Sequence, residues 1–545
     1  MIGIHKMQPA EHSAVSARAR NPSRRMEMAL LLGLGSLACI LLAILVLQLR
    51  GIWLHYQYYI TTGGENLTVY GIWKVQEGHP LYTWPNQEFL QLTLYNFGFY
   101  YVYAILLDFF QARGPLIMLY GRYLTVVFAI CGLFIQVRLL SFLTKDVLNR
   151  LVSAAIWLVC FCTWFNSYFP GYFPVSVRPD VVAVAMSTLG LYCFIIYSAT
   201  DKLRWVLAAA AIWVVTWCLK QADVSCIFGA GVYLLLSRKW PAAVVLSLTF
   251  AIPVALILGF GSAEYRWNIL VAPTANSLDI FEGAKAFLTG LSRSLFTWTF
   301  VATLPFYLSR AWSSGTQRRF NDLLEQARPG GRLSSIVALA VVVLAGMAPS
   351  LLALSKTGSS LNQMYEVFVA ATTLSFVLAL RLAVDMPDRA VRRFSAILGA
   401  TLISMCAFPI CQLAMNRIGP IVRASDADMA RKEKFALFLK TLKTPVFIED
   451  DIYSLPWHCN GNQYPAIMLD PIFYYDAKKR GMISGGVEQL IARHWFAALY
   501  LEEDSPFYKA AIDANYQKQP LAGEYSRCLD SLGKESKPRV LLSAP

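Results

Sequence analysis

Charged residues are scarce in this chain. Asp, Glu, Lys and Arg make up 15% of its 545 residues, whereas 56% are hydrophobic, and the mean hydropathy is +0.47. A soluble domain has about a quarter of its residues charged. The composition therefore excludes an ordinary soluble protein. Uncharged runs such as residues 29–49 instead predict helices that cross a hydrocarbon core about 30 Å thick.

Acidic residues are fewer than basic ones, and the cysteines lack the spacing of metal ligands. Asp and Glu number 34 against 48 Lys and Arg, and the net charge is +14. The basic residues lie in short loops between apolar runs, which indicates membrane orientation rather than nucleic-acid binding. Nine of the eleven cysteines lie in or near apolar segments without metal spacing, and we interpret them as core residues. For Cys459 and Cys528, in the polar C-terminal region, a disulfide and two free thiols both fit.

Basic clusters predict the orientation of the chain. Four arginines precede the first apolar run, so the N-terminus is expected to be cytoplasmic. The same rule applied to later loops predicts eleven spans, at 29–49, 116–137, 151–169, 181–199, 205–219, 223–237, 241–261, 291–308, 334–354, 366–384 and 394–415. Counting the apolar stretch 92–110 as a span would break the charge rule. It is therefore expected to be a re-entrant or interfacial helix.

The expected fold class is an α-helical polytopic membrane protein with about eleven transmembrane helices and a small C-terminal α/β domain. The predicted units are a cytoplasmic segment at 1–26, a transmembrane module at 27–415 and a periplasmic domain at 416–545. In the last unit, strands are expected at 445–449 and 466–469, and helices at 424–442, 485–493 and 506–515. Acidic residues that end or follow these strands fit solvated strand ends or a lid over a site.

The ionisable residues of most interest fall in loops on one predicted face of the membrane. They and their neighbours are Glu65, Gly78-His79-Pro80-Leu81-Tyr82, Tyr95-Asn96, Arg178-Pro179-Asp180 and Lys220-Gln221. Lys220 ends a predicted span of only about 15 residues, which is too short to cross the bilayer. An ionisable group below the membrane surface costs roughly 2.5–3.5 kcal/mol, so Lys220 indicates a functional site.

Two carboxylates and several cations on one face suit a site that binds a lipid phosphate and deprotonates a hydroxyl. Partial desolvation is expected to raise the pKa of such a carboxylate. A cation would stabilise the charge that develops on a leaving phosphate. The structural alternatives are a solvated loop acid for Glu65, a helix-dipole acid for Asp180, and interfacial snorkelling for Arg178 and Lys220.

The order of these motifs resembles the GT-C superfamily of membrane glycosyltransferases, over most of residues 27–415. It is similar above all to the bacterial aminoarabinose, mannosyl and arabinofuranosyl transferases that use polyprenyl-phosphate sugars. The matching positions are Glu65, Gly78 to Tyr82, Tyr95-Asn96, Arg178 to Asp180, Lys220-Gln221 and Lys356 to Asn362. Many relatives carry two acids at the first site, whereas this chain has Gly64-Glu65-Asn66. That difference weakens a claim for a divalent metal, and no metal or other cofactor is expected.

The resemblance implies inverting transfer of a sugar from a polyprenyl-phosphate donor. Glu65 would be the general base, and Asp180 would orient the acceptor or a supporting cation. The donor phosphate would be held by Arg178, Lys220, Gln221 and Lys356. Candidate substrate-binding residues are His79, Tyr82, Tyr95, Asn96 and Asn362.

The expected partners are the lipid-linked donor, a cell-envelope glycan or lipid acceptor, and the bilayer of a bacterial inner membrane, but not nucleic acid. Two other functions are left open: a lipid or sugar transporter or flippase, and a non-enzymatic assembly or sensor protein. Transporters often contain two related halves, and the sequence has no such internal repeat.

Overall fold

A computed structural model describes most of the chain. The described residues are 24–58, 60–61, 64–84, 93–165, 172–292, 332–356, 359, 361–385, 426–442, 444–449, 453–458, 471–483, 485–521 and 538–545. The predicted spans at 291–308 and 394–415 lie almost entirely outside these residues. The predicted strand at 466–469, Cys459 and Cys528 also lie outside them.

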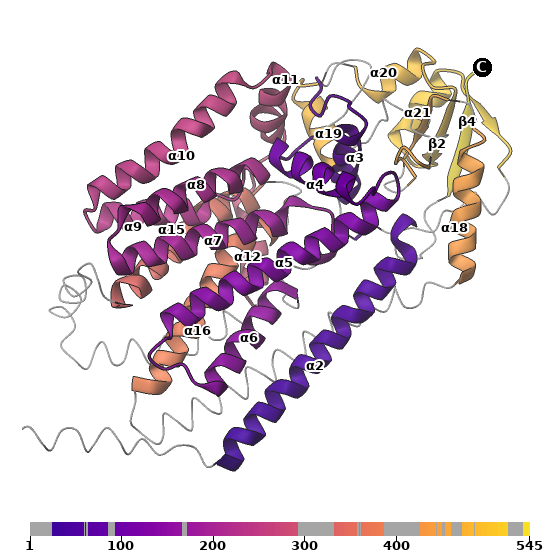
Figure 1. The fold of residues 1–545 in the computed structure, drawn as a ribbon. Helices are drawn as coiled ribbons and strands as arrows, with labels where there is room; N and C mark the ends of the chain where they lie inside the picture. The colour runs from indigo at the N-terminus through magenta and orange to yellow at the C-terminus, as the bar shows by residue number, and fades with distance from the viewer. Residues whose placement is uncertain are drawn as a thin grey trace, which may run out of the picture.

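Apolar helices form the body of the molecule (Figure 1). Six contain stretches long and apolar enough to cross a membrane: α2 (Arg24–His55), α5 (Leu116–Leu143), α7 (Pro179–Thr200), α10 (Trp240–Phe260), α15 (Arg332–Leu354) and α16 (Tyr365–Asp385). Four are shorter: α4 (Phe97–Phe109), α6 (Arg150–Phe165), α8 (Leu203–Leu219) and α9 (Ser225–Leu236). Each predicted span within the described residues coincides with one of these helices. The multi-pass helical class is confirmed, and the number eleven stays a prediction.

Helix α7 is the centre of the bundle. Its membrane stretch is 78% buried, and it packs against α5, α8, α9, α15 and α16. The stretch in α10 is only 6% buried and exposes Val244, Leu248, Ile252 and Leu256. A soluble protein rarely exposes so large an apolar face. The outer helices are therefore suited to contact lipid, while α7 supplies the core.

Short elements cover one end of the bundle. Helix α3 (Glu65–Gln76) packs against α4, whose 13 residues are too few to cross a membrane. The apolar stretch 92–110 thus contains this short helix, and its predicted re-entrant or interfacial position stays a prediction. The other short elements are η1 (Tyr56–Tyr58), η2 (Phe173–Val175), α11 (Ala263–Arg266), the π-helical η3 (Trp267–Val271), η4 (Ala272–Thr274), α12 (Ile280–Ser292) and η5 (Leu361–Met364).

The C-terminal region contains a small mixed sheet and flanking helices. The sheet order is β1-β2-β4-β3, with β1 parallel to β2 and β4 antiparallel to both of its neighbours. Its elements are α18 (Asp426–Leu439), β1 (Val446–Ile448), α19 (Pro471–Lys479), α20 (Val487–Ala492), β2 (Ala498–Glu502), α21 (Pro506–Asp513), β3 (Gln517–Gln519) and β4 (Arg539–Ser543). The predicted α/β character is confirmed, although the sequence did not predict β2, β3 or β4.

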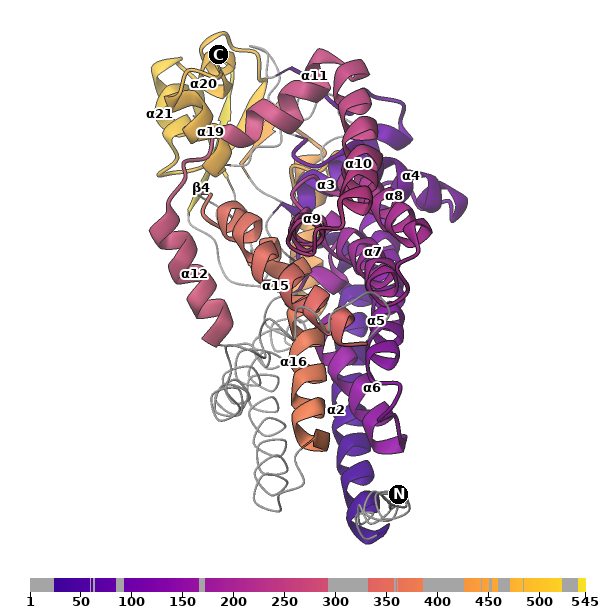
Figure 2. The same cartoon turned by 90° about the vertical axis from the view of Figure 1, so that its left-hand side faces the viewer.

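The C-terminal sheet lies at the end of the bundle opposite the start of α2 (Figure 2). One buried cluster contains Phe435 of α18, Ile448 of β1 and Tyr500 of β2 together with Trp73 of α3 and Tyr100 of α4. This shared core fixes α3 and α4 between the sheet and the membrane helices. The segment that carries Glu65 is therefore held in place from both sides.

Candidate functional site

A tight turn brings Glu65 into the interior. Gly64 precedes α3 with φ of +78°, in the left-handed region that glycine adopts without strain. A Cβ atom at this position would lie 3.5 Å from a terminal nitrogen of Arg178. Gly64 thus starts α3 close to a second motif, which contains Arg178.

Protein donors surround both carboxylate oxygens of Glu65. Oε1 accepts from Arg122 Nε at 2.9 Å and from the Val177 backbone N–H at 2.8 Å. Oε2 accepts from Arg122 Nη2 at 2.9 Å, and from the Thr61 backbone N–H and hydroxyl at 2.7 and 2.8 Å. The Glu65 side chain is fully buried. These contacts make it an ionised anchor between α3, α5 and the loop before α7.

The expected rise in the pKa of Glu65 is contradicted by this arrangement. Burial alone opposes ionisation, but the Arg122 ion pair and the N–H donors from Thr61 and Val177 outweigh it. Together they hold the pKa of the Glu65 carboxyl below its ordinary value. A raised pKa is expected for a partly desolvated acid without a dedicated cation. Arg122 supplies that cation, and the base role of Glu65 stays a prediction.

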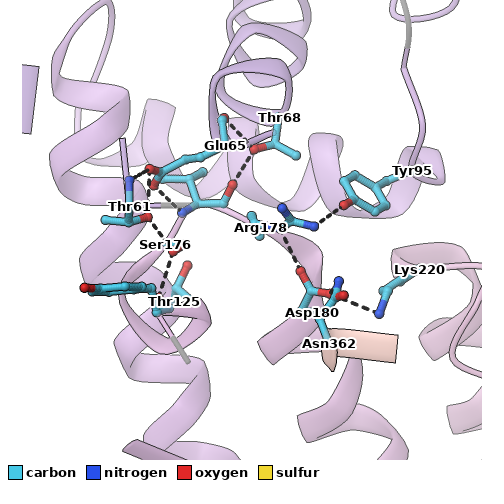
Figure 3. Close-up of polar contacts among 12 residues, drawn as sticks. Thr61, Glu65, Thr68, Tyr95, Thr125, Ser176, Arg178, Asp180, Lys220 and Asn362 are labelled. Atoms are coloured by element: carbon cyan, nitrogen blue, oxygen red, sulfur yellow. Dashed lines mark hydrogen bonds and ion pairs between the residues drawn. The ribbon is translucent and has the colours of Figure 1, made fainter. Parts of the chain in front are cut away.

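A second buried carboxylate, Asp180, lies on the other side of the Ser176–Arg178 segment (Figure 3). Pro179 and Asp180 begin α7, where a proline at the first position suits the helix start. Asp180 Oδ2 pairs with Arg178 Nε at 3.0 Å. Asp180 Oδ1 pairs with Lys220 Nζ at 3.0 Å and accepts from Asn362 Nδ2 at 2.6 Å. The guanidinium of Arg178 also donates to the Tyr95 hydroxyl at 2.5 Å.

Lys220 ends α8 and lies between two carboxylates. Besides Asp180, its Nζ contacts Asp223 Oδ1 at 2.8 Å, and all three side chains are almost fully buried. The Lys220 side chain is only 1% exposed, so this cation lies in the protein interior, while its predicted depth in the membrane stays a prediction. Removing one charge from such a set is expected to cost several kcal/mol, because the remaining charge loses its partner.

The structure thus brings five predicted site residues into one polar cluster: Tyr95, Arg178, Asp180, Lys220 and Asn362. They come from the loop before α4, the start of α7, the end of α8 and η5. Four well-separated parts of the sequence therefore converge at the end of the bundle nearest the C-terminal sheet. We call these five residues and Asp223 the central cluster.

Other predicted site residues support the loops around the central cluster. Tyr82 donates to the Tyr95 carbonyl at 2.9 Å, and Gln221 donates to the Leu94 carbonyl at 2.7 Å. Asn96 caps α4 and donates to the Trp217 carbonyl at 2.9 Å. These contacts fix the position of Tyr95 and connect it to the end of α8.

Two further predicted residues lie apart from the central cluster. The His79 ring packs near Trp73, with ring centroids 5.3 Å apart. Lys356 follows α15, where its backbone bridges Leu278, and it joins none of the ion pairs just described. Their predicted substrate and phosphate contacts stay predictions.

Two residues of the site were missed in the sequence. Arg122 lies within a run predicted to be a span, and Asp223 lies just beyond the predicted outer loop. The signal for Arg122 was present, because an arginine inside an apolar span is costly and normally has a buried partner. Among the described residues, no group of three or more His, Cys, Asp and Glu side chains is arranged to hold a metal ion.

Comparison with known proteins relates the fold to solved structures. No protein-family model matches the chain, and no curated protein is detectably similar in sequence. The crystal structure of ArnT from Cupriavidus metallidurans bound to undecaprenyl phosphate superposes with a TM-score of 0.55 at 11% identity, covering 94% of this chain and 99% of that one. The apo form gives a TM-score of 0.50 with the same identity and coverage.

An oligosaccharyltransferase from Archaeoglobus fulgidus is a more distant match. It has a TM-score of 0.41 at 10% identity, and covers 80% of this chain and 60% of that chain. The identities in all three comparisons are low. The likeness therefore concerns the arrangement of the backbone and not the reaction.

Proposed function

We propose that this protein, which has the fold of the GT-C membrane glycosyltransferases, transfers a sugar from a polyprenyl-phosphate donor to a cell-envelope glycan or lipid. The reaction would take place at the periplasmic face of a bacterial inner membrane. The acceptor oxygen would bond to the anomeric carbon as the bond from that carbon to the phosphate oxygen breaks. The electron pair leaves with the phosphate, and a carboxylate takes the acceptor proton.

The central cluster is the observation that carries this proposal. Two buried cations, Arg178 and Lys220, are positioned by the same carboxylate, Asp180, at one end of a membrane-embedded bundle. Buried cations stabilise developing negative charge more strongly than exposed ones, because little water screens them. A lipid phosphate is an anion that every bilayer surface presents to a membrane protein. The ArnT structure with a comparable fold has undecaprenyl phosphate bound.

We assign the roles as follows. Arg178 and Lys220 contact the donor phosphate, Asp180 orients both cations, and Tyr95 and Asn362 fix their geometry. Glu65 acts through Val177 as a positioning residue for the Ser176–Arg178 segment, because both of its oxygens already have protein donors. The predicted base role is the alternative for Glu65.

The test of the reaction uses purified protein in nanodiscs with a radiolabelled polyprenyl-phosphate sugar and an envelope extract as acceptor. Asp180→Asn is expected to lower turnover at least about 100-fold, because removing a charge-stabilising contact typically costs this much. The matched control is Asp201→Asn, since Asp201 pairs with Lys239 at the far end of α7. Equal turnover in both variants would refute the assignment of Asp180.

Glu65→Gln separates the two roles of Glu65. A lost base lowers kcat and leaves binding of undecaprenyl phosphate intact. A lost anchor weakens binding and lowers the unfolding temperature together, because Arg122 is left buried with a neutral partner. We expect the second outcome.

The transporter alternative predicts a different result. Flux of a lipid-linked sugar across sealed vesicles, with no transfer to any acceptor, would refute the proposed reaction and support a transporter.

A further inference from the structure

Asp223 is a buried carboxylate for which the proposed reaction has no role so far. Its Oδ1 pairs with Lys220, and its side chain is 2% exposed. Its Oδ2 is buried and has no hydrogen-bonding partner within the described part of the chain. A buried carboxylate oxygen without a donor is destabilising, so its retention points to a second state in which Oδ2 is satisfied.

The charges around Asp223 show what that second state is. The charged groups that act on it are Lys220 at the end of α8, Glu366 in the first turn of α16, and Asp180 in the first turn of α7. Both carboxylate oxygens of Glu366 already have donors, because they accept from the backbone N–H groups of Ser225 and Cys226 at 2.8 and 3.1 Å. Lys220 is therefore the only cation among these groups, and two carboxylates share it.

The central cluster is electrically balanced before any ligand enters. Arg178 and Lys220 offset Asp180 and Asp223. A lipid phosphodiester adds one negative charge to a water-poor site, and an unpaired buried charge is costly. One carboxylate must therefore lose its charge or move away from Lys220.

Asp180 and Asp223 are not equivalent in this respect. Asp180 has three partners, Arg178, Lys220 and Asn362, that favour its ionised form. Within the described part of the chain, Asp223 has only Lys220 as an ion-pair partner. Protonation of Asp223 at Oδ2 therefore loses the least. It turns an oxygen that has no partner among the described residues into a hydroxyl that can donate to the incoming phosphate.

We propose that Asp223 forms an ion pair with Lys220 in the free protein. The donor phosphate then replaces Asp223 as the partner of Lys220, and Asp223 binds one proton. Asp223 is then a positioning residue that couples phosphate binding to proton uptake. When the lipid phosphate leaves, the proton leaves Asp223 and the ion pair with Lys220 forms again. This inference rests on the proposed function, since it concerns the same phosphate site.

The experiment measures binding of a polyprenyl methyl phosphodiester to protein in nanodiscs. This probe keeps a single charge across the neutral range, whereas a phosphomonoester itself takes up a proton near pH 6. For the wild type, Kd should rise about tenfold per pH unit once Asp223 is ionised in the free site, because one proton is bound with each ligand. Asp223→Asn should bind at least about tenfold more tightly at pH 8, with little dependence on pH.

The control variant Asp201→Asn should retain the wild-type affinity and pH profile. Proton uptake is also measured directly on the wild type with a pH indicator in weak buffer, so the result does not depend on how well Asp223→Asn folds. Up to one proton per bound diester is expected. Binding without proton uptake, or equal pH profiles for wild type and Asp223→Asn, would overturn the role of Asp223. Absence of any diester binding would instead contradict the proposed function.

Discussion

At the scale of single residues, the environment of His458 predicts how the stability of the protein depends on pH. It is buried where the C-terminal region meets η1, its ring stacks on Tyr58 with centroids 5.3 Å apart, and its Nε2 accepts from Trp457 Nε1 at 3.1 Å. Burial, with a smaller effect of Lys440, lowers the pKa of His458 to about 4. The folded protein therefore keeps this ring neutral under mildly acidic conditions.

The sign of the effect follows from the two pKa values. In the unfolded chain His458 takes up a proton below pH of about 6.5, whereas in the folded chain it does so only near pH 4. Stability is therefore full above about pH 6.5 and falls by about 3 kcal/mol as the pH drops to about 4. His458→Phe keeps an aromatic ring and should flatten the fall in unfolding temperature over this range.

The comparison for this prediction is His494→Asn. His494 follows α20 with φ of +53°, a conformation that asparagine tolerates. This variant should keep the wild-type pH profile of the unfolding temperature. A His458→Phe profile parallel to that of the wild type would show that His458 does not control the acid sensitivity.

The sequence predicts which residues belong to the site better than it predicts which residues contact one another. The short predicted span draws attention to Lys220, and its side chain is buried in the protein. The partner of Glu65 could not be found in this way, because Arg122 and Val177 are 57 and 112 positions away. Pairing over such separations depends on how helices pack, and the local sequence does not encode that.

At the scale of elements, glycines set the distance between α9 and α15. A Cβ atom at Gly229 would lie 2.5 Å from the Val342 carbonyl oxygen, and one at Gly346 would lie 2.9 Å from the Ser225 carbonyl oxygen. Small residues allow membrane helices to approach closely and gain packing energy. This contact also holds the start of α9, and hence Asp223, beside α7 and α16.

Gly229→Ala is expected to lower the unfolding temperature, since the methyl group meets backbone that cannot turn aside. The cost of such overpacking is typically about 1–3 kcal/mol. Gly231→Ala on the same helix is the matched control, because a Cβ there has nothing within 4 Å. Alanine is the better helix former by up to about 1 kcal/mol, so this control should be neutral or stabilising. Equal destabilisation by both changes would argue against the close contact.

Helices and strands differed in how well the sequence predicted them. The apolar runs predicted the helices of the bundle because each is long and continuous. Strands such as β3 (Gln517–Gln519) have three to five residues and are stabilised by partners far along the chain, as in the pairing of β2 with β4. Patterns this short do not identify a strand before its partner is known.

At the scale of the whole molecule, the two ends of the bundle differ in chemistry. One end lies beside the C-terminal sheet and contains the central cluster. The other end exposes basic residues such as Lys202, between α7 and α8, and Arg204, in the first turn of α8. Helix α7 joins them, with Asp180 in its first turn and Lys202 just beyond its last. Its 22 residues span about 33 Å, close to the thickness of a hydrocarbon core.

This arrangement predicts opposite accessibility for the two ends in intact cells. A cysteine replacing exposed Asp513 at the end of α21 should react with a membrane-impermeant maleimide, because the C-terminal sheet would be periplasmic. A cysteine replacing Lys202 should react only after the membrane is permeabilised, since basic loops remain cytoplasmic. The unmodified chain provides the background, because Cys39 and Cys131 lie on exposed apolar helix surfaces. Labelling of both positions from the same side would place the phosphate site and the basic loops together and invalidate the proposed orientation.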